Sequence, residues 1–402
     1  MRRVAVTGIG VICANGNNRR EFWETTQGGQ TGIAPVRQVD LTGFRFTHGA
    51  EVKDYRAGDH FPEKQADFMD RFAQFGVIAA REALADCGIR LTPELRENTA
   101  IVTGSCVGGQ NSQDEGFWAI YKEGRSRVHP LTIPKTMANA GASHISMELG
   151  ITGPSFTFST ACASSAHAIG HAFWMVRSGA ADLALAGGSE APFSFGILRA
   201  WEAMRVVSPD TCRPFSKDRS GMILGEGAAM LALEPLEAAV ARGAQIYGEI
   251  AGFGMSADAA HITQPSPSGA AHAMRLALRD AQLAGEQIGY INAHGTGTLA
   301  NDVSETQAIR QLFGAHAGRL AVSSTKGVHG HALGAAGALE AAATLLALRH
   351  AVLPPTANYR EPDPSCDLDV IPNDPRRLEV ECALSNSFAF GGLNAVLAFR
   401  KV

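Results

Sequence analysis

Three short segments of the chain combine a nucleophile or proton-transferring groups with small neighbouring side chains. Cys162 lies in the run STACASS of residues 159–165, where a predicted strand gives way to a long apolar helix. The positive end of a helix dipole favours thiolate, so this position predicts a nucleophilic cysteine with a lowered pKa. Many cysteines are only small core residues, and the placement alone leaves that alternative open.

The other two segments carry imidazole and ammonium groups. His294 ends a predicted strand in the run NAHGTGT, and Lys326 precedes His331 in the run SSTKGVHGHALG. Two imidazoles from separate strand ends beside a thiolate favour chemistry on a carbonyl group. Each histidine taken alone could equally be a core or capping residue. A zinc site that adds His329 is disfavoured, because these tight loops lack a nearby carboxylate pattern, and we predict no metal.

The elements that must position these groups follow a repeated order. The strand 155–159 leads into the helix 163–178, and the strand 320–323 leads in the same way into the helix 334–349. Strand and helix order that recurs at a fixed place in each half indicates an internal duplication. The sequence therefore predicts a duplicated, layered α/β architecture with mixed sheets.

A second pair of matching elements extends the duplication. The helix expected at 64–88 precedes a buried strand, and the helix expected at 275–283 does the same in the second half. We expect residues 1–250 to form the half that carries the cysteine. We expect residues 251–402 to form the half that carries the histidines and the lysine.

Composition excludes several classes of function. The 402 residues are 45% hydrophobic and 18% charged, and the net charge of −4 gives no electrostatic footprint for nucleic acid. Seven scattered cysteines without a CxxC pair favour free thiols in a reducing compartment, so we expect a cytoplasmic protein. The longest apolar run, residues 332–348, contains Glu340 and is too short for a membrane span.

The glycine pattern near the N-terminus does not indicate a cofactor. Gly8 and Gly10 follow a predicted strand, but the third glycine of a dinucleotide fingerprint is missing and no acidic residue stands at the expected distance. The same glycines interrupt the N-terminal apolar run, which therefore resembles a signal peptide only weakly. We therefore read residues 4–13 as a first strand.

Taken in order, these segments resemble those of the β-ketoacyl-[acyl carrier protein] synthases, condensing enzymes of the thiolase superfamily. The resemblance is to the elongating type II-like enzymes and runs from residues 4–8 to the segment SNSFAFGGLN, residues 385–394. Within the family, residues 354–364 and 395–400 are most similar to the nodulation-type branch. The resemblance implies a thiolase-like fold with duplicated αβαβα halves and mixed sheets.

The resemblance also implies a mechanism. Cys162 takes an acyl group from a carrier protein as a thioester, and malonyl carrier protein then loses carbon dioxide and attacks it. His294 and His331 donate Nε hydrogen bonds to the malonyl thioester oxygen, and Lys326 orients them. Backbone N–H groups of Cys162 and Phe390 form an oxyanion hole, and Phe390 gates the acyl pocket. The enzyme needs no cofactor beyond carrier-bound phosphopantetheine and is expected to act as a homodimer with acyl carrier protein as its partner.

Further residues match supporting positions of the family. Asp302 and Glu305 correspond to an acidic pair linked to the lysine and to ordered water. Thr296 and Thr298 correspond to contacts with phosphopantetheine. Glu340 interrupts an apolar helix, where a carboxylate is costly unless paired, so we expect it to join a buried network with Lys326.

Several positions depart from the usual elongating enzyme. His329 replaces a threonine, and Leu393 replaces another threonine. Ala389, next to the gating Phe390, replaces a glycine. In the acyl pocket, Thr132 replaces a phenylalanine that reaches across the dimer interface. Val107 replaces a bulkier isoleucine, and Trp201 refills part of the space. The altered pocket predicts a preference for long or polyunsaturated acyl chains.

Two related classes of protein fit less well. A thiolase needs a second catalytic cysteine in a glycine-rich C-terminal context, which neither Cys366 nor Cys382 has. A chain-length factor, the non-condensing partner subunit of a polyketide-type synthase, lacks the reactive cysteine that Cys162 provides. The chain-length factor remains the alternative, and labelling of Cys162 would separate the two.

Overall fold

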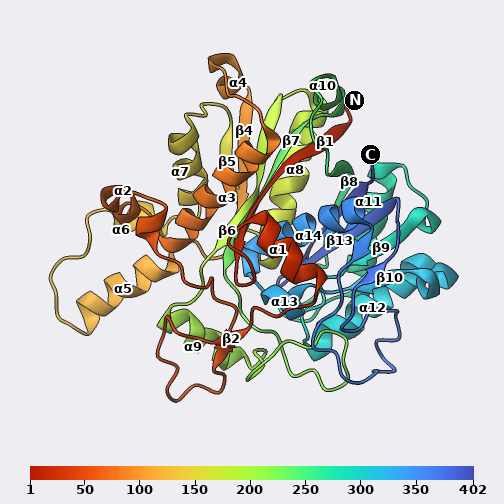
Figure 1. The fold of residues 1–402 in the computed structure, drawn as a ribbon. Coiled ribbons are helices and arrows are strands. Elements are labelled where there is room, and N and C mark those ends of the chain that lie inside the picture. The colour runs from red at the N-terminus through yellow and green to blue at the C-terminus, as the bar shows by residue number, and fades with distance from the viewer.

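The computed structural model describes residues 1–402, and its centre is a sheet of ten strands (Figure 1). The sheet order is β10-β9-β13-β14-β8-β1-β7-β6-β4-β5. The strands of the first half are β1 (Val4–Cys13), β4 (Thr99–Gly104), β5 (Ser155–Phe158), β6 (Leu183–Glu190) and β7 (Gly227–Pro235). Those of the second half are β8 (Gly248–Ala257), β9 (Ile288–Asn292), β10 (Ala321–Ser323), β13 (Cys382–Ala389) and β14 (Leu393–Arg400).

Helices and short turns connect these strands. The helices of the first half are α1 (Arg19–Gln27), α2 (Glu63–Asp67), α3 (Arg71–Cys87), α4 (Pro93–Glu97), α5 (Gln110–Tyr121), α6 (Thr132–Thr136), α7 (Ala140–Leu149), α8 (Ser164–Ser178), α9 (Phe195–Met204) and α10 (Leu236–Ala241). Those of the second half are α11 (Pro267–Ala281), α12 (Leu299–Phe313), α13 (Lys326–His329) and α14 (Ala336–His350). Short strands β2 (Ala34–Pro35) and β3 (His48–Gly49) pair with each other, as do β11 (Val352–Leu353) and β12 (Arg376–Arg377). The 3-10 turns are η1 (Ala57–Asp59), η2 (Ala161–Ala163), η3 (Gly285–Gln287), η4 (Gly314–Arg319) and η5 (Leu333–Ala335).

The pairing of the strands shows the duplication directly. The order β1-β7-β6-β4-β5 in the first half corresponds to β8-β14-β13-β9-β10 in the second. In each set the first two pairs are antiparallel and the last two are parallel. The two sets join through a short antiparallel pairing of β1 with β8. The predicted duplicated α/β architecture with mixed sheets is confirmed.

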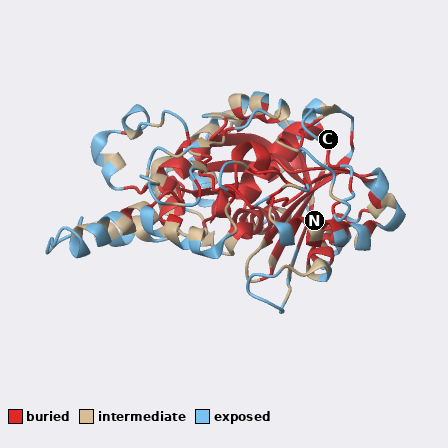
Figure 2. Cartoon of the chain, turned by 90° about the horizontal axis from the view of Figure 1, so that it is seen from below, coloured by how far each residue is buried: buried red, intermediate tan, exposed pale blue.

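Helices cover both faces of each five-stranded set. The outer helix α3 contacts β1, β6 and β7, and α11 occupies the matching place on β8 and β14. Between the two sets lie α8 and α14, each of which contacts strands from both halves (Figure 1). Residues 336–348 of α14 are all buried, and Figure 2 shows the buried residues concentrated in this middle layer.

Glycines in β1 permit the close approach of the outer helix. A Cβ at Gly10 would lie 2.0 Å from the Ala79 carbonyl oxygen of α3, and a Cβ at Gly8 would lie 2.1 Å from that of Ala83. In the second half, Gly254 meets the Ala273 carbonyl of α11 in the same way, at 2.2 Å. The Gly-x-Gly pattern of β1 therefore serves packing of a helix on a strand.

One expected helix differs in its bounds. The helix predicted at 64–88 is two helices, α2 and α3, which are separated at residues 68–70. The Asp70 carboxylate accepts a hydrogen bond from the Phe72 N–H and so caps the start of α3. The apolar spacing continued across this break, and the capping residue decided where the helix begins. No helix of the chain has the length and apolar character that a membrane crossing requires.

Candidate active site

Cys162 lies on a strained turn between β5 and α8. The preceding residue, Ala161, has a φ of +49°, a conformation that side chains with a Cβ rarely adopt. The 3-10 turn η2 then leads into α8, so the thiol stands at the N-terminal end of that helix, with only 6% of the residue exposed. The expected position of the cysteine at the junction of strand and helix is thus found in the structure.

The same turn occurs in the second half without a nucleophile. Leu333, the first residue of η5, has a φ of +45° ahead of α14, and Gly334 takes the place that Cys162 has in the first half. A Cβ at Gly334 would lie 2.4 Å from the backbone nitrogen of Cys106. No side chain fits there, so this turn can carry chemistry in one half only.

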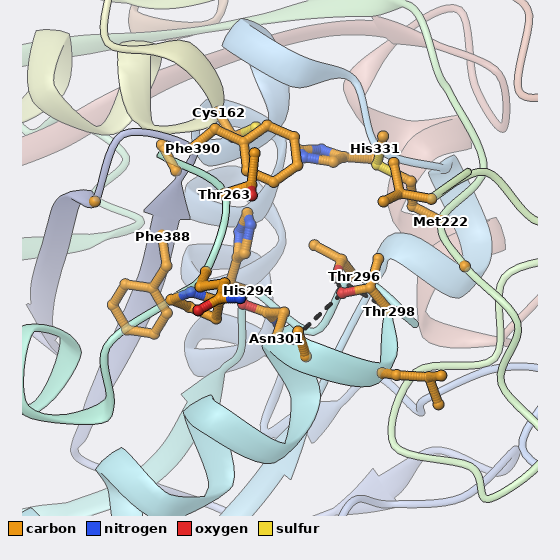
Figure 3. Close-up of a pocket in the computed structure, with 18 of the residues that line it drawn as sticks. Cys162, Met222, Thr263, His294, Thr296, Thr298, Asn301, His331, Phe388 and Phe390 are labelled. Carbon is orange, nitrogen blue, oxygen red and sulfur yellow. Dashed lines mark hydrogen bonds between the residues drawn. The ribbon is translucent and has the colours of Figure 1, made fainter. Parts of the chain in front are cut away.

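His294 and His331 meet in a cavity together with Cys162 (Figure 3). Their ring centroids are 5.3 Å apart with the rings nearly perpendicular, at 85°. The cavity has a volume of about 270 Å³. His294 enters from the loop after β9 and His331 from the segment after α13. The sequence-predicted thiol and both imidazoles are therefore brought together from the two halves of the chain.

Lys326 determines which nitrogen of His294 carries the proton. Its ammonium lies 3.3 Å from His294 Nδ1 and donates to the His294 carbonyl oxygen at 2.6 Å. An ammonium can only donate, so Nδ1 accepts and Nε2 carries the hydrogen. The ammonium also forms an ion pair with Glu340, and both side chains are fully buried. The expected pairing of the Glu340 carboxylate with Lys326 is found.

Both catalytic candidates among the histidines are neutral at physiological pH. Burial, the charge of Lys326 and the neighbouring His331 hold the pKa of His294 well below its usual value. Burial, Lys326 and His329 do the same to the pKa of His331. A neutral His294 that carries its hydrogen on Nε2 donates a hydrogen bond without bringing a second cation beside the ammonium.

The predicted lowering of the thiol pKa is wrong. Burial raises the pKa of Cys162 to about 11, although the charge of Lys326 and a hydrogen bond from the Phe390 N–H each lower it in part. Desolvation of a thiolate in this enclosed site is the largest of these contributions. The resting nucleophile is therefore the thiol.

This raised pKa predicts how alkylation depends on pH. Only the thiolate reacts, and its fraction grows about tenfold per pH unit below the pKa. Alkylation of Cys162 by iodoacetamide should therefore accelerate continuously from pH 7 to pH 10. Mass spectrometry of the Cys162 peptide measures the rate, and circular dichroism at each pH verifies that the chain stays folded. A rate that levels off below pH 8 would contradict the burial argument.

Phe390 closes one side of the cavity. It follows β13, and its backbone N–H donates to the Cys162 sulfur, so this N–H lies beside the nucleophile. Its ring stacks on Trp201 of α9, with centroids 6.2 Å apart and an angle of 27° between the planes. Trp201 also lines the cavity, as expected of a pocket residue.

The acidic pair expected to be linked to the lysine and to ordered water makes no direct contact with the lysine. Glu305 accepts hydrogen bonds from the backbone N–H groups of His294 and Gly295, at 2.9 and 2.8 Å. Asp302 accepts from the N–H groups of Phe215 and Gly297 at 2.7 and 3.2 Å. Both carboxylates lie in α12 and hold the backbone of the histidine loop, while Glu340 alone neutralises Lys326.

The remaining predicted residues lie at different distances from the thiol. Thr296 and Thr298 line the cavity and share a hydrogen bond of 2.8 Å between their hydroxyls (Figure 3). Val107 and Thr132 do not line it. Val107 lies in the loop after β4, and Thr132 begins α6 beside a groove between α5 and α6. The cavity within one chain therefore ends before these two positions.

His329 does not reach the cavity, whereas His331 does. The three histidines weighed as zinc ligands therefore do not converge on one point, and no cluster suited to a metal ion is found. Spacing from Lys326 favoured His331 as the catalytic candidate, and its place beside Cys162 supports that choice.

Sequence reasoning missed one loop of the site. Residues 258–265, between β8 and α11, cover the cavity with Asp258, His261 and Thr263 among its lining residues. The Ile262 carbonyl accepts a hydrogen bond from Gly391, next to Phe390, at 2.7 Å. The polar, proline-containing run between a strand and a helix was the only signal in the sequence for this loop.

Comparison with known proteins covers almost the whole chain. Residues 1–239 match the family described as "Beta-ketoacyl synthase, N-terminal domain", and residues 247–360 match "Beta-ketoacyl synthase, C-terminal domain". Nodulation protein E of Rhizobium sp. (strain N33) is 48% identical over 401 residues, which is 100% of both chains. The 3-oxoacyl-[acyl-carrier-protein] synthase 2 of Synechocystis sp. is 42% identical and covers 100% of this chain and 98% of the relative.

Solved structures agree in fold. "The ishigamide ketosynthase/chain length factor" has a TM-score of 0.94 at 38% identity and covers 100% of this chain and 99% of its own. A chain from the structure titled as a type II polyketide synthase acyl-carrier protein in complex with its ketosynthase has a TM-score of 0.91 at 32% identity. The match covers 100% of this chain and 99% of that chain. The predicted thiolase-like fold is confirmed. The predicted resemblance to the β-ketoacyl synthases and the narrower resemblance to their nodulation-type branch are also confirmed.

Proposed function

The chain belongs to the β-ketoacyl synthase family and is a condensing enzyme of the acyltransferase class, and we propose that it extends an acyl group held on Cys162. The second substrate is malonyl-[acyl carrier protein], and the products are 3-oxoacyl-[acyl carrier protein] and carbon dioxide. The observation that carries this proposal is the meeting of Cys162, His294 and His331 at one cavity, with Lys326 fixing the tautomer of His294.

In the first half-reaction, the Cys162 sulfur attacks the thioester carbonyl of an acyl carrier protein. The N–H groups of Cys162 and Phe390 stabilise the oxyanion that forms. The bond to the phosphopantetheine sulfur breaks, and the proton lost by Cys162 ends on that departing thiol. A thiol that is protonated at rest fits this exchange, because one thiol replaces another and no net charge enters the buried site.

In the second half-reaction, malonyl carrier protein replaces the departed carrier. Nε2–H of His294 and of His331 donate to its thioester oxygen, where negative charge grows as carbon dioxide leaves. The enolate carbon then attacks the acyl thioester on Cys162, and the thiolate that leaves takes up a proton from solvent. Thr296 and Thr298 offer hydroxyls to the phosphopantetheine arm along the same cavity wall.

The acyl chain extends beyond the Phe390–Trp201 pair. Movement of Phe390 off Trp201 opens the path, and Ala389 beside it restricts the backbone more than the usual glycine would. Val107 and Thr132 have less volume than the residues they replace. We therefore expect long or polyunsaturated chains to be accepted. We propose that the enzyme needs no cofactor beyond the phosphopantetheine that its substrates carry.

Enlarging Thr132 should narrow this chain-length range. Thr132→Phe places a ring where the chain ends, so kcat/KM for the longest chains should fall by about 10- to 100-fold, while short chains change little. Competition between acyl carrier proteins of different lengths, read by mass spectrometry, measures the ratio. Val240→Phe, on the exposed face of α10 and outside this groove, serves as the control. A uniform loss across all lengths would contradict the pocket assignment.

We expect acyl carrier protein as the partner of the site and a second copy of this chain as the partner of the β5 edge. β5 ends the sheet, and its Phe156 is 37% exposed. Helix α7 contacts β5, α6 contacts α7, and α5 contacts α6. These three helices expose the large apolar side chains of Met147, Ile133 and Tyr121, respectively. This surface continues into Thr132, which supports a dimer in which each copy closes its partner's acyl pocket.

Seven free cysteines support a cytoplasmic location.

A chain-length-factor-like subunit is the second candidate, because one of the similar solved structures combines a ketosynthase with such a factor. The test incubates the chain with malonyl carrier protein and a panel of acyl carrier proteins. Acylation of Cys162 and release of an extended 3-oxoacyl product are expected by mass spectrometry. A folded chain that neither takes up acyl groups nor reacts with cerulenin would support the non-condensing alternative instead.

A further inference from the structure

His329 lies in a segment that only the second half contains. In the first half, residues 159–160 alone connect β5 to the turn η2. In the second half, residues 324–332 connect β10 to the turn η5 and include the one-turn helix α13. This inserted segment carries Lys326 at its start and His331 near its end. The contacts that fix the conformation of this segment therefore determine the positions of Lys326 and His331.

The ring of His329 bridges the two ends of α13. Its Nδ1 lies 2.8 Å from the Gly330 carbonyl oxygen, and its Nε2 lies 2.9 Å from the Thr325 hydroxyl. A carbonyl can only accept, so Nδ1 carries the hydrogen and Nε2 accepts from the hydroxyl. Both ring nitrogens are thus satisfied by residues that flank the helix, and the ring is fully buried.

A neutral ring is required for this bridge. Burial and the charge of Lys326 lower the pKa of His329 to about 3, so the ring is uncharged near neutral pH. It also contacts Phe22 of α1, with centroids 6.4 Å apart, which fixes α13 against the neighbouring helix. A threonine side chain is too short to span the same two partners.

The bridge acts on the backbone next to the catalytic groups. Gly330 turns the chain with a φ of +69°, and a Cβ there would lie 2.7 Å from that of Ala50. The carbonyl of Gly330 belongs to the peptide that joins it to His331. At the other end, Thr325 directly precedes Lys326, whose ammonium must stay within reach of His294 Nδ1 at 3.3 Å.

We propose that His329 is a positioning residue, whose neutral ring clamps Thr325 to Gly330 and so holds Lys326 and His331 in place for decarboxylation. This inference rests on the proposed function. It predicts a selective defect: acyl transfer to Cys162 uses the oxyanion hole, whereas decarboxylation depends on the histidines and the lysine. Displacement of a catalytic group by about 1 Å can cost about 100-fold in rate.

The test measures the two half-reactions separately on the full chain. His329→Leu removes both hydrogen bonds, so kcat for carbon dioxide release from malonyl carrier protein should fall by about 10- to 100-fold with little change in KM. Acylation of Cys162, followed by mass spectrometry, should stay within about threefold of the parent. His329→Asn keeps a donor for the Gly330 carbonyl and should recover much of the lost rate.

Thr325→Val tests the same bridge from its other end and gives the answer if His329→Leu fails to fold. It should reproduce the selective loss of decarboxylation. Equal losses in both half-reactions, or parent-like decarboxylation in His329→Leu, would overturn the proposal. His331→Ala is the reference for complete loss. A parent chain that releases no carbon dioxide would count against the proposed function itself, which distinguishes the two failures.

Discussion

Replacement of Cys162 by serine is expected to lower acyl transfer by at least about 10³-fold. A serine hydroxyl is far less acidic than a thiol, and the site offers no strong base to ionise it. His294 already carries its hydrogen on Nε2, since Lys326 occupies Nδ1, so that imidazole donates and does not take up a proton. Covalent acyl-enzyme, measured by mass spectrometry after incubation with an acyl carrier protein, should disappear.

Decarboxylation should survive this substitution, because the groups that stabilise the enolate remain. Cys106→Ser is the matched control, since this second thiol is only partly buried and does not line the cavity. It should retain acyl transfer within about twofold. Acyl-enzyme formed by the Cys162→Ser chain at a rate near that of the parent would show that another residue is the nucleophile.

The second large effect concerns the buried ion pair. Lys326→Met leaves the Glu340 carboxylate without its cation in the interior, and removal of one partner of a buried pair costs about 3–5 kcal/mol in the free energy of unfolding. The substitution also releases the tautomer of His294. We therefore expect decarboxylation to fall by about 100-fold or more, beyond what the loss of stability explains.

A double-mutant cycle separates these two effects. Lys326→Met with Glu340→Leu removes both charges, so chemical denaturation should show less destabilisation than the sum of the single variants. Catalysis should not return with stability, because the donor to His294 is still missing. Lys401→Met removes the ammonium of an exposed pair with Glu379 and should leave the free energy of unfolding nearly unchanged. If the losses in the free energy of unfolding were additive in the cycle, the two side chains would not stabilise each other.

The repeated order of strands and helices was enough to predict the fold. Apolar spacing marked α8 and α14, and the matching positions of β5 and β10 predicted that both halves present a turn before a buried helix. The break between α2 and α3 escaped this reasoning, because the apolar side chains continue across it and only the Asp70 cap ends the pattern. Helix termini depend on single polar contacts that periodicity does not register.

The site was predictable in its residues but not in its electrostatics. Spacing and resemblance identified Cys162, His294, Lys326 and His331, and the cost of an unpaired carboxylate identified the partner of Lys326. The pKa of Cys162 was predicted in the wrong direction, since the helix end is visible in the sequence and the depth of burial is not. Asp302 and Glu305 were expected to be linked to the lysine, and their direct partners include backbone N–H groups, which no pattern of side chains reveals.

The paired turns at Ala161 and Leu333 bear on the ancestry of the chain. A left-handed backbone at a residue other than glycine is unfavourable, yet both halves retain it at the same place before their central helix. Chemistry cannot account for the second copy, because Gly334 has no reactive group. The geometry that presents a nucleophile in one half is thus also kept in the half that has none, as expected of two copies of one ancestral unit.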